Sequence, residues 1–152
     1  MDNKQWSSVE ESRQRINADI CPIDERITVP LAEALLAVLA EDVIAPFNVP
    51  GHDNSAMDGF ACLLADVGHA QENGKEIALS VQGRAFAGHP YTGEAMVRGA
   101  CIKIMTGAQV PAGCDVVVPQ EETTMAANGD VVIAANPRRS KGLHIRAAGE
   151  DL

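Results

Sequence analysis

The chain has 152 residues, enough for one medium domain or two small subdomains and too few for a large multi-domain enzyme. Hydrophobic residues make up 46% and charged residues 22%, which excludes intrinsic disorder and fibrous repeats and predicts a folded chain. The formal net charge of -9 repels phosphate backbones and anionic membranes, so neither nucleic acid nor a membrane surface is an expected partner.

The first part of the chain is predicted to be helical. Ser8 and Glu11 fit the capping-box pattern, so a helix is expected to run to about Ala18, before Cys21-Pro22 breaks it. A second helix is predicted from Pro30, because apolar residues recur at helical spacing and should bury one face. These residues are Leu31, Leu35, Val38 and Leu39.

The middle of the chain is predicted to be β-rich. Pro46 and Pro50 lie close together and mark a boundary, since each stops a helix and favours extended chain. Strands are expected where apolar residues alternate with others, in residues 77–81 and 100–104, and in the apolar run of residues 115–120.

The last part of the chain contains a hairpin signal and a basic segment. Asn128-Gly129 lies between residues 123–127 and 130–135 and predicts a hairpin with a two-residue turn. Residues 138–146 are rich in basic side chains, which could bind an anion while the final carboxylate holds a metal. A solvated connecting segment is the interpretation that spacing alone favours.

The cysteines and histidines are scattered along the chain. Cys21, Cys62, Cys101 and Cys114 form no C-x-x-C pair, so reduced structural thiols are expected and a Cys/His metal site is not. The N-terminus has no basic start followed by an apolar stretch, and no apolar run is long enough to span a membrane. A cytoplasmic protein is therefore expected.

The densest polar cluster is residues 51–59. It places Asp53, Asn54, Ser55 and Asp58 beside glycines, and such a loop could hold Mg²⁺ or orient a phosphate through backbone amides. The same residue types also build turns by bonding their own backbone, and spacing alone favours the turn.

A second candidate follows the predicted strand of residues 100–104. Thr106-Gly107 could present a hydroxyl and exposed amides to an anion, although a plain strand end is the simpler interpretation. The chain contains no Ser-His-Asp order, no phosphate-cradling loop with Lys and no G-x-G-x-x-G turn.

Taken together, several segments resemble the signature of the MoeA family, the molybdopterin molybdenumtransferases, whose pattern the related domain of the scaffold gephyrin shares. The matching segments are Pro50-Gly51 with residues 53–61, Phe86-Ala87-Gly88 with Gly93, residues 102–108 with Pro111 and Gly113, Val117-Val118 with Glu121, and Ile145-Arg146 with Gly149-Glu150-Asp151. The resemblance runs from about Pro30 to the end and covers the N-terminal part of longer family members. Phe60 stands where the family usually has tyrosine, which keeps a core ring and removes a hydroxyl.

The resemblance implies an α+β fold. N-terminal helices and a returning C-terminal segment, residues 1–49 and 137–152, would form a helical, elongated domain. Residues 50–136 would form an inserted β-rich, barrel-like domain. The downstream molybdopterin-binding domain of the family has no counterpart in the chain.

The resemblance also implies a reaction, in which adenylylated molybdopterin and molybdate give molybdenum cofactor and AMP with Mg²⁺ assistance. Family members are homodimers with the site in a cleft between subunits. By position in the motifs, the catalytic candidates are Asp58, Thr106 and Asp151, and Asp58 and Asp151 are candidate Mg²⁺ ligands. The candidate substrate-binding residues are Asn54, Ser55, Gly107 and Arg146. Molybdate and tungstate are not distinguished.

Three hypotheses follow. The first is a piece of the transferase that is inactive alone, binds no cofactor tightly and works as a homodimer, with other molybdenum cofactor synthesis proteins as further partners. The second is a dimerisation or protein-interaction module, which would leave the apolar stripe of residues 31–39 uncovered within the chain and buried against a second copy. The third is a generic β-rich anion-binding domain.

Overall fold

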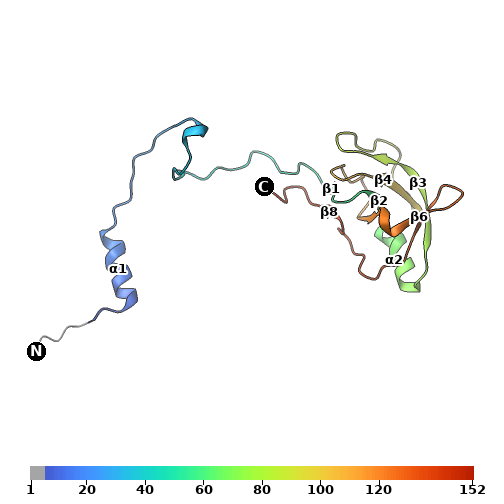
Figure 1. The fold of residues 1–152 in the computed structure, drawn as a ribbon, viewed down its shortest axis with the longest axis horizontal. Coiled ribbons are helices and arrows are strands. Elements are labelled where there is room, and N and C mark those ends of the chain that lie inside the picture. Colours follow the sequence, from blue (N-terminus) through green and yellow to red (C-terminus); the bar gives the residue numbers. More distant parts are fainter. Residues whose placement is uncertain (1–5) are drawn as a thin grey trace, which may run out of the picture. The chain divides into compact units, whose positions relative to one another are not determined.

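The computed structural model describes residues 6–152 and, within them, the side chains of all residues except 69–73. The chain forms two compact units, drawn as a ribbon in Figure 1. Unit 1 ends at Val43, and unit 2 comprises Ile44–Leu152. Within the described residues, no helix has the length and apolar character needed to cross a bilayer.

Unit 1 contains the predicted first helix, α1 (Val9–Asp19), which confirms the capping-box prediction. The Ser8 hydroxyl accepts a hydrogen bond from the Glu11 amide at 3.2 Å, and Glu11 Oε2 accepts one from the Ser8 amide at 2.8 Å. These two bonds with Ser8 lower the pKa of the Glu11 carboxyl. Because α1 has no buried residue, local capping rather than packing defines where it begins.

The second predicted helix is wrong. Only one 3-10 turn, η1 (Leu31–Glu33), forms there, and Leu36 has a left-handed φ of 67° that interrupts any continuing helix. The apolar stripe is uncovered, with exposed fractions of 92% for Leu31, 83% for Leu35, 94% for Val38 and 73% for Leu39. A short amphipathic helix gains most of its stability from burying its apolar face, and no described residue covers this one.

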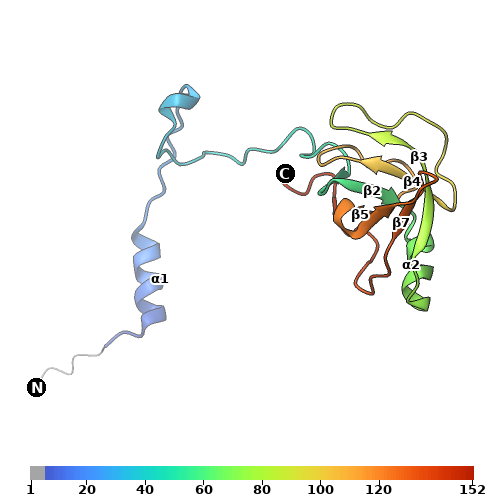
Figure 2. The ribbon, with the colours of Figure 1, turned by 45° about the vertical axis from the view of Figure 1, so that its right-hand side comes forward.

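Unit 2 is built on a six-stranded mixed sheet that curls into a half-barrel (Figure 2). Its strands are β2 (Gly59–Cys62), β3 (Ile77–Ala85), β4 (Ala100–Ile104), β5 (Val116–Pro119), β6 (Thr123–Met125) and β7 (Val131–Ile133). Their order is β5-β2-β4-β3-β7-β6, in which only the β3–β4 pair is parallel. The three strand segments expected from the sequence are therefore confirmed.

Both faces of this sheet are buried. On β4, Cys101 joins one apolar cluster while its neighbours Ile102 and Ile104 join the other. The helix α2 (Leu64–Asn73) supplies Val67 to the first cluster, and the carboxylate of Asp115 accepts from the first helical amide at 2.6 Å. Each fully buried Ile or Val side chain contributes about 1.5–3 kcal/mol to stability. The second cluster comprises Ala61, Ala85, Ile102, Ile104, Ala108 and Val117.

The predicted hairpin is confirmed, but its turn is longer than expected. Strands β6 and β7 pair with Met125 opposite Val131, and the Ala126 amide donates to the Asp130 carbonyl at 2.9 Å. The turn between Ala126 and Asp130 therefore has three residues, 127–129, rather than two. Gly129 has a φ of 89°, the left-handed residue that closes a three-residue hairpin loop.

Phe60, Cys62 and Cys101 lie in the core of unit 2, and Cys114 is partly buried against it. Phe60 is only 6% exposed, which confirms the core role expected for its ring. Burial raises the pKa of the Cys101 and Cys114 thiols to about 12 and that of Cys62 further still. These three cysteines form no disulfide and are buried or partly buried, as expected for structural thiols, whereas Cys21 is exposed.

Candidate functional site

Three segments that lie far apart in the sequence meet around β1 (Asn54–Ser55). On one side, β1 pairs with β8 (Ile145–Arg146), with Asn54 opposite Arg146. On the other side, the Ser55 amide donates to the Ala108 carbonyl, and the Gly107 amide donates to the Ser55 carbonyl, both at 2.9 Å. We call residues 53–58, 105–110 and 145–151 the three-segment site.

The second core cluster packs against two of these three segments. Ala108 is fully buried in that cluster, and Ile145 packs against it. The two segments that flank β1 are therefore each anchored by an apolar side chain next to a candidate site residue. Gly107 and Arg146 are those neighbours.

Asp58 and Thr106 are in direct contact. Oδ1 of Asp58 accepts from both the amide and the hydroxyl of Thr106, each at 2.7 Å. These two bonds, with a further contribution from the charge of Lys103, lower the pKa of the Asp58 carboxyl. Asp58 is therefore ionised at neutral pH. No described residue donates a hydrogen bond to its second oxygen, Oδ2.

The turn after β4 does not offer free amides, which agrees with the plain strand end that spacing favoured at Thr106-Gly107 and not with an anion site built from its amides. Every amide of the turn has an acceptor within the chain. The acceptors are the Ala85 carbonyl for Met105, Asp58 for Thr106, the Ser55 carbonyl for Gly107 and the Met105 carbonyl for Ala108. Thr106 therefore orients the Asp58 carboxylate rather than forming an anion-binding nest.

The residues that precede Asp58 form a turn, as spacing alone favoured. The Ser55 hydroxyl donates to the Met57 carbonyl at 2.6 Å, and its side chain is almost fully buried. The side-chain oxygen Oδ1 of Asn54 is also buried and has no donor among the described residues. Substrate contacts by Asn54, Ser55 and Gly107 stay predictions.

The C-terminal segment of the site is organised by ion pairs. Arg146 donates to Asp151 Oδ1 at 2.5 Å, and its Nε lies 3.5 Å from Glu150 Oε1. The bond from Asp151 and the charges of both acids raise the pKa of Arg146. Glu150 also accepts from the Ala147 amide at 3.0 Å, a role that the motif Gly149-Glu150-Asp151 did not reveal.

Asp58 and Asp151 contact different segments of the site, and their shared role as Mg²⁺ ligands stays a prediction. Asp58 is bonded to the segment on one side of β1, and Asp151 to β8 on the other. Among residues 6–152, side chains of 69–73 aside, no group of three His, Cys, Asp or Glu could hold a metal. Mg²⁺ commonly uses one or two carboxylates together with waters and substrate phosphates, which Asp58 alone could join.

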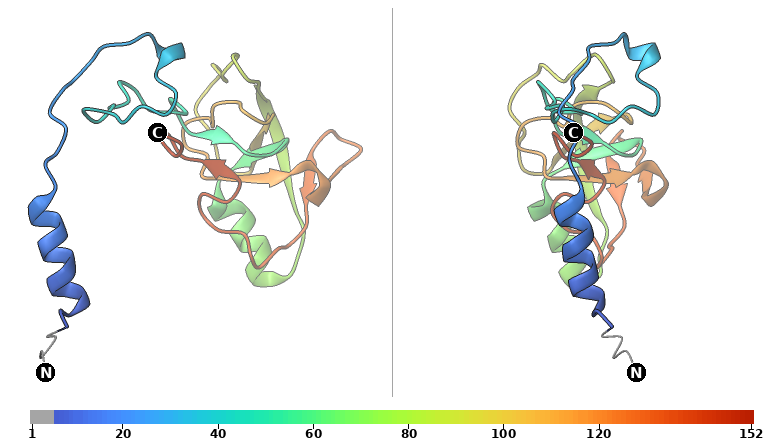
Figure 3. Two further views of the ribbon diagram at one scale, coloured as in Figure 1. Left: turned by 60° about the vertical axis from the view of Figure 1, so that its left-hand side comes forward. Right: turned by 90° about the vertical axis from the view of Figure 1, so that its left-hand side faces the viewer.

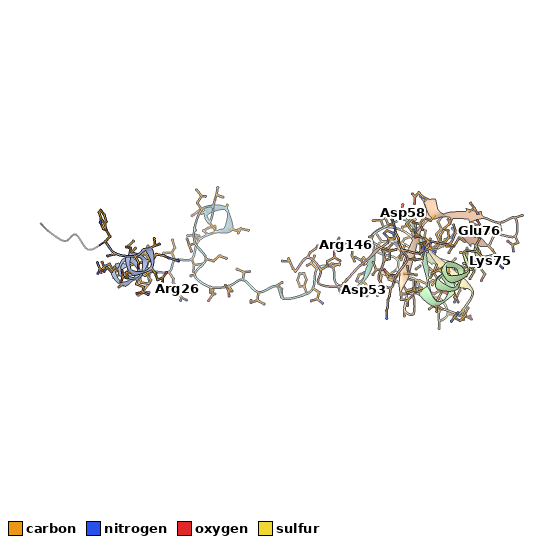
Figure 4. All side chains as sticks on the ribbon, turned by 90° about the horizontal axis from the view of Figure 1, so that it is seen from below. Arg26, Asp53, Asp58, Lys75, Glu76 and Arg146 are labelled. Atoms are coloured by element: carbon orange, nitrogen blue, oxygen red, sulfur yellow. The ribbon has the colours of Figure 1, made fainter. Side chains whose placement is uncertain are left out.

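Sequence reasoning missed two further polar contacts. Asp53 Oδ1 accepts from the Ala148 amide at 2.9 Å across 95 residues of sequence. Arg139 is buried and pairs with Glu122 at 2.8 Å, so it does not belong to a solvated basic patch. The opposite charges of Glu122 and Arg139 on the two flanks of the predicted hairpin were the available signal. In Figure 4, Asp53 and Arg146 are labelled on the side where the chain enters unit 2, and Asp58 is labelled between them and Glu76.

The chain resembles proteins of one family. Residues 7–152 match the sequence model described as the MoeA N-terminal region, domains I and II. A molybdopterin molybdenumtransferase of Haemophilus influenzae is 41% identical over 122 residues, which cover 80% of this chain and 28% of that protein. One from Synechococcus elongatus is 41% identical over 124 residues, covering 82% of this chain and 30% of that protein.

A solved structure shares the fold. The molybdopterin biosynthesis moeA protein from Pyrococcus horikoshii OT3 superposes with a TM-score of 0.73 at 31% identity, covering 94% of this chain and 36% of that one. The chain thus spans about a third of the length of the relatives it matches. From its motifs, its fold and these relatives, the chain belongs to the MoeA family and corresponds to the N-terminal region of that family.

Proposed function

We propose that the chain is the N-terminal region of a molybdopterin molybdenumtransferase. In this role it contributes to the conversion of adenylylated molybdopterin and molybdate to molybdenum cofactor, with release of AMP. The observation that carries the proposal is the Asp58 carboxylate, which Thr106 orients and keeps ionised. The names of the chain's relatives and its match to the MoeA N-terminal region support the same reaction.

The chemistry assigned to the site is electrostatic. Asp58 would hold Mg²⁺ through Oδ2, and the bound ion would neutralise the charge of the substrate phosphate. Arg146, held by Asp151, would face the anionic substrate. The further substrate contacts are proposed for Asn54, Ser55 and Gly107. A cytoplasmic location is also proposed, from the biosynthetic role that the relatives' names describe.

The proposal is tested with a hybrid protein in which this chain replaces the matching region of the H. influenzae molybdopterin molybdenumtransferase. We expect the hybrid to insert molybdenum, and the 152-residue chain alone to show no turnover, because the relatives are about three times as long. AMP release and cofactor formation are measured for both. Turnover by the chain alone contradicts the need for further domains. A folded hybrid without turnover, beside an active parent, contradicts the proposed function.

A second candidate function, dimerisation, is favoured by the uncovered stripe of Leu31, Leu35, Val38 and Leu39. Four large apolar side chains exposed within nine residues are typical of a segment that binds a partner. We propose that two copies of the chain bury this stripe against each other, as the family's homodimers suggest.

The dimer proposal predicts a solution mass of twice 16.0 kDa by light scattering. Leu35→Asp together with Leu39→Asp should give the monomer mass, because two charges cannot be buried in an apolar contact without a large cost. Met125→Asp is the matched control, since Met125 is also exposed but lies in unit 2. A monomeric wild-type chain refutes the proposal.

A further inference from the structure

The C-terminal arm, residues 145–152, is fastened to residues 49–55 by its backbone amides. Gly149 donates to the Pro50 carbonyl at 2.9 Å, and Asp151 donates to the Val49 carbonyl at 2.9 Å. The Leu152 carbonyl in turn accepts from the Val49 amide at 3.1 Å. Both views in Figure 3 show the C-terminus beside the segment that leads into β1. The arm is therefore held along its length by the chain that precedes the signature loop.

One amide of the arm is held by a side chain from outside the arm. The Ala148 amide donates to Asp53 Oδ1 at 2.9 Å. The backbone carbonyl of Asp53 accepts from the Val110 amide, also at 2.9 Å, so this residue binds both neighbours of β1. Its side chain fixes the arm, and its main chain fixes the segment that follows Thr106.

The two segments that Asp53 joins carry the polar pairs of the three-segment site. The arm holds Arg146 with Asp151, and the opposite segment holds Thr106 with Asp58. We propose that Asp53 is a positioning residue, which sets the Arg146–Asp151 pair at a fixed place relative to the Asp58 carboxylate. This inference rests on the proposed function, because it assumes that the Arg146–Asp151 pair and the Asp58–Thr106 pair act on one substrate.

The contact itself shows what Asp53 must supply. Its partner is a neutral backbone amide, so the interaction needs an acceptor oxygen at this place and does not need a charge. The amide oxygen of asparagine can accept the same bond. Alanine leaves the Ala148 amide without its acceptor and frees the arm to shift. A residue that bound Mg²⁺ directly would instead require the carboxylate charge.

The test compares Asp53→Ala, Asp53→Asn and Asp58→Asn in the hybrid protein. For Asp53→Ala, we expect kcat to fall by about 100-fold with a smaller change in KM, as for a misplaced reacting group. Asp53→Asn should restore activity to within a few-fold of wild type, whereas Asp58→Asn should not be tolerated. An Asp53→Asn variant as impaired as Asp53→Ala refutes the positioning role, and so does a fully active Asp53→Ala variant.

A second measurement does not depend on turnover. In the 152-residue chain, Asp53→Ala should speed hydrogen exchange at the amides of residues 147–152, while the amides of β2 and β5 keep their protection. Asp53→Asn should leave both sets unchanged. Unchanged exchange in Asp53→Ala overturns the inference. If the exchange pattern is as expected but the wild-type hybrid has no activity, the proposed function fails and the positioning contact stands.

Discussion

Asp58→Asn in the hybrid protein is expected to lower kcat for molybdenum insertion by about 100-fold or more, the typical loss when one preorganised electrostatic group is removed. Asparagine can still accept the bonds from the Thr106 amide and hydroxyl, so the turn should keep its structure. What is lost is the charge that is proposed to hold Mg²⁺. The readouts are AMP release and cofactor formation, and a kcat close to that of wild type contradicts the assignment of Asp58.

Thr106 provides the matched pair of controls for this prediction. Thr106→Val removes the hydroxyl donor and leaves the amide, so the pKa of Asp58 should rise toward its ordinary value. Thr106→Ser keeps the hydroxyl and should keep the lowered pKa. The carboxyl carbon shift of Asp58, followed by NMR in the 152-residue chain, measures both. Equal pKa values in Thr106→Val and wild type would show that the hydroxyl does not stabilise the carboxylate.

The sign of the pH dependence follows from the lowered pKa. The bonds from Thr106 stabilise the folded chain at pH values above the ordinary Asp range, and this contribution is lost as the pH falls through the lowered pKa of Asp58. In Thr106→Val, the acid limb of the activity profile should therefore move to higher pH. In Thr106→Ser it should stay where it is in wild type.

Gly59→Ala is expected to destabilise unit 2 by about 3 kcal/mol or more, at the upper end of the cost of overpacking a core. A Cβ at this position would lie 2.0 Å from the Val118 carbonyl oxygen and 2.9 Å from its carbon. Both atoms belong to the backbone of β5, which pairs with β2 through Gly59 and Pro119. Because no flexible side chain can move away, the two strands would have to separate. Urea unfolding of the 152-residue chain measures the loss.

Gly51→Ala is the control for this substitution. The nearest atom to its added Cβ is the Asn48 carbonyl oxygen at 4.0 Å, so we expect a change of less than about 0.5 kcal/mol. Equal unfolding midpoints for the two variants would refute the close approach of β2 and β5. Gly59 directly follows Asp58, so the close approach of β2 and β5 also fixes the backbone next to the Asp58 carboxylate.

Much of the fold was predictable because its signals are local. The capping box of Ser8 and Glu11 involves four consecutive residues, and it defines the start of α1 as expected. The alternation in residues 100–104 likewise predicted β4, although it pointed to one buried face and the sheet buries both. The family motifs placed Asp58 and Thr106 in one site, and the structure brings these two residues into direct contact.

The remainder depends on contacts between distant segments. The spacing of Leu31 and Leu35 predicts an amphipathic helix, but such a helix forms only where a partner surface covers it, and none of the described residues does so. The bond from Ala148 to Asp53 spans 95 residues, a separation at which spacing carries no information. The sequence placed Arg146 and Asp151 in one motif, but it did not predict the hydrogen bond between them.

The mutual hydrogen bonds between Val49 and Leu152 bring the two ends of residues 49–152 together. Each of these residues donates its amide to the carbonyl of the other, at 3.1 and 3.3 Å, so the two ends of the segment lie one strand spacing apart. A segment with adjoining ends can be spliced into a surface loop of an unrelated host, or circularised with a few residues, without being stretched. The half-barrel could thus be gained, lost or exchanged by recombination as a single piece of sequence.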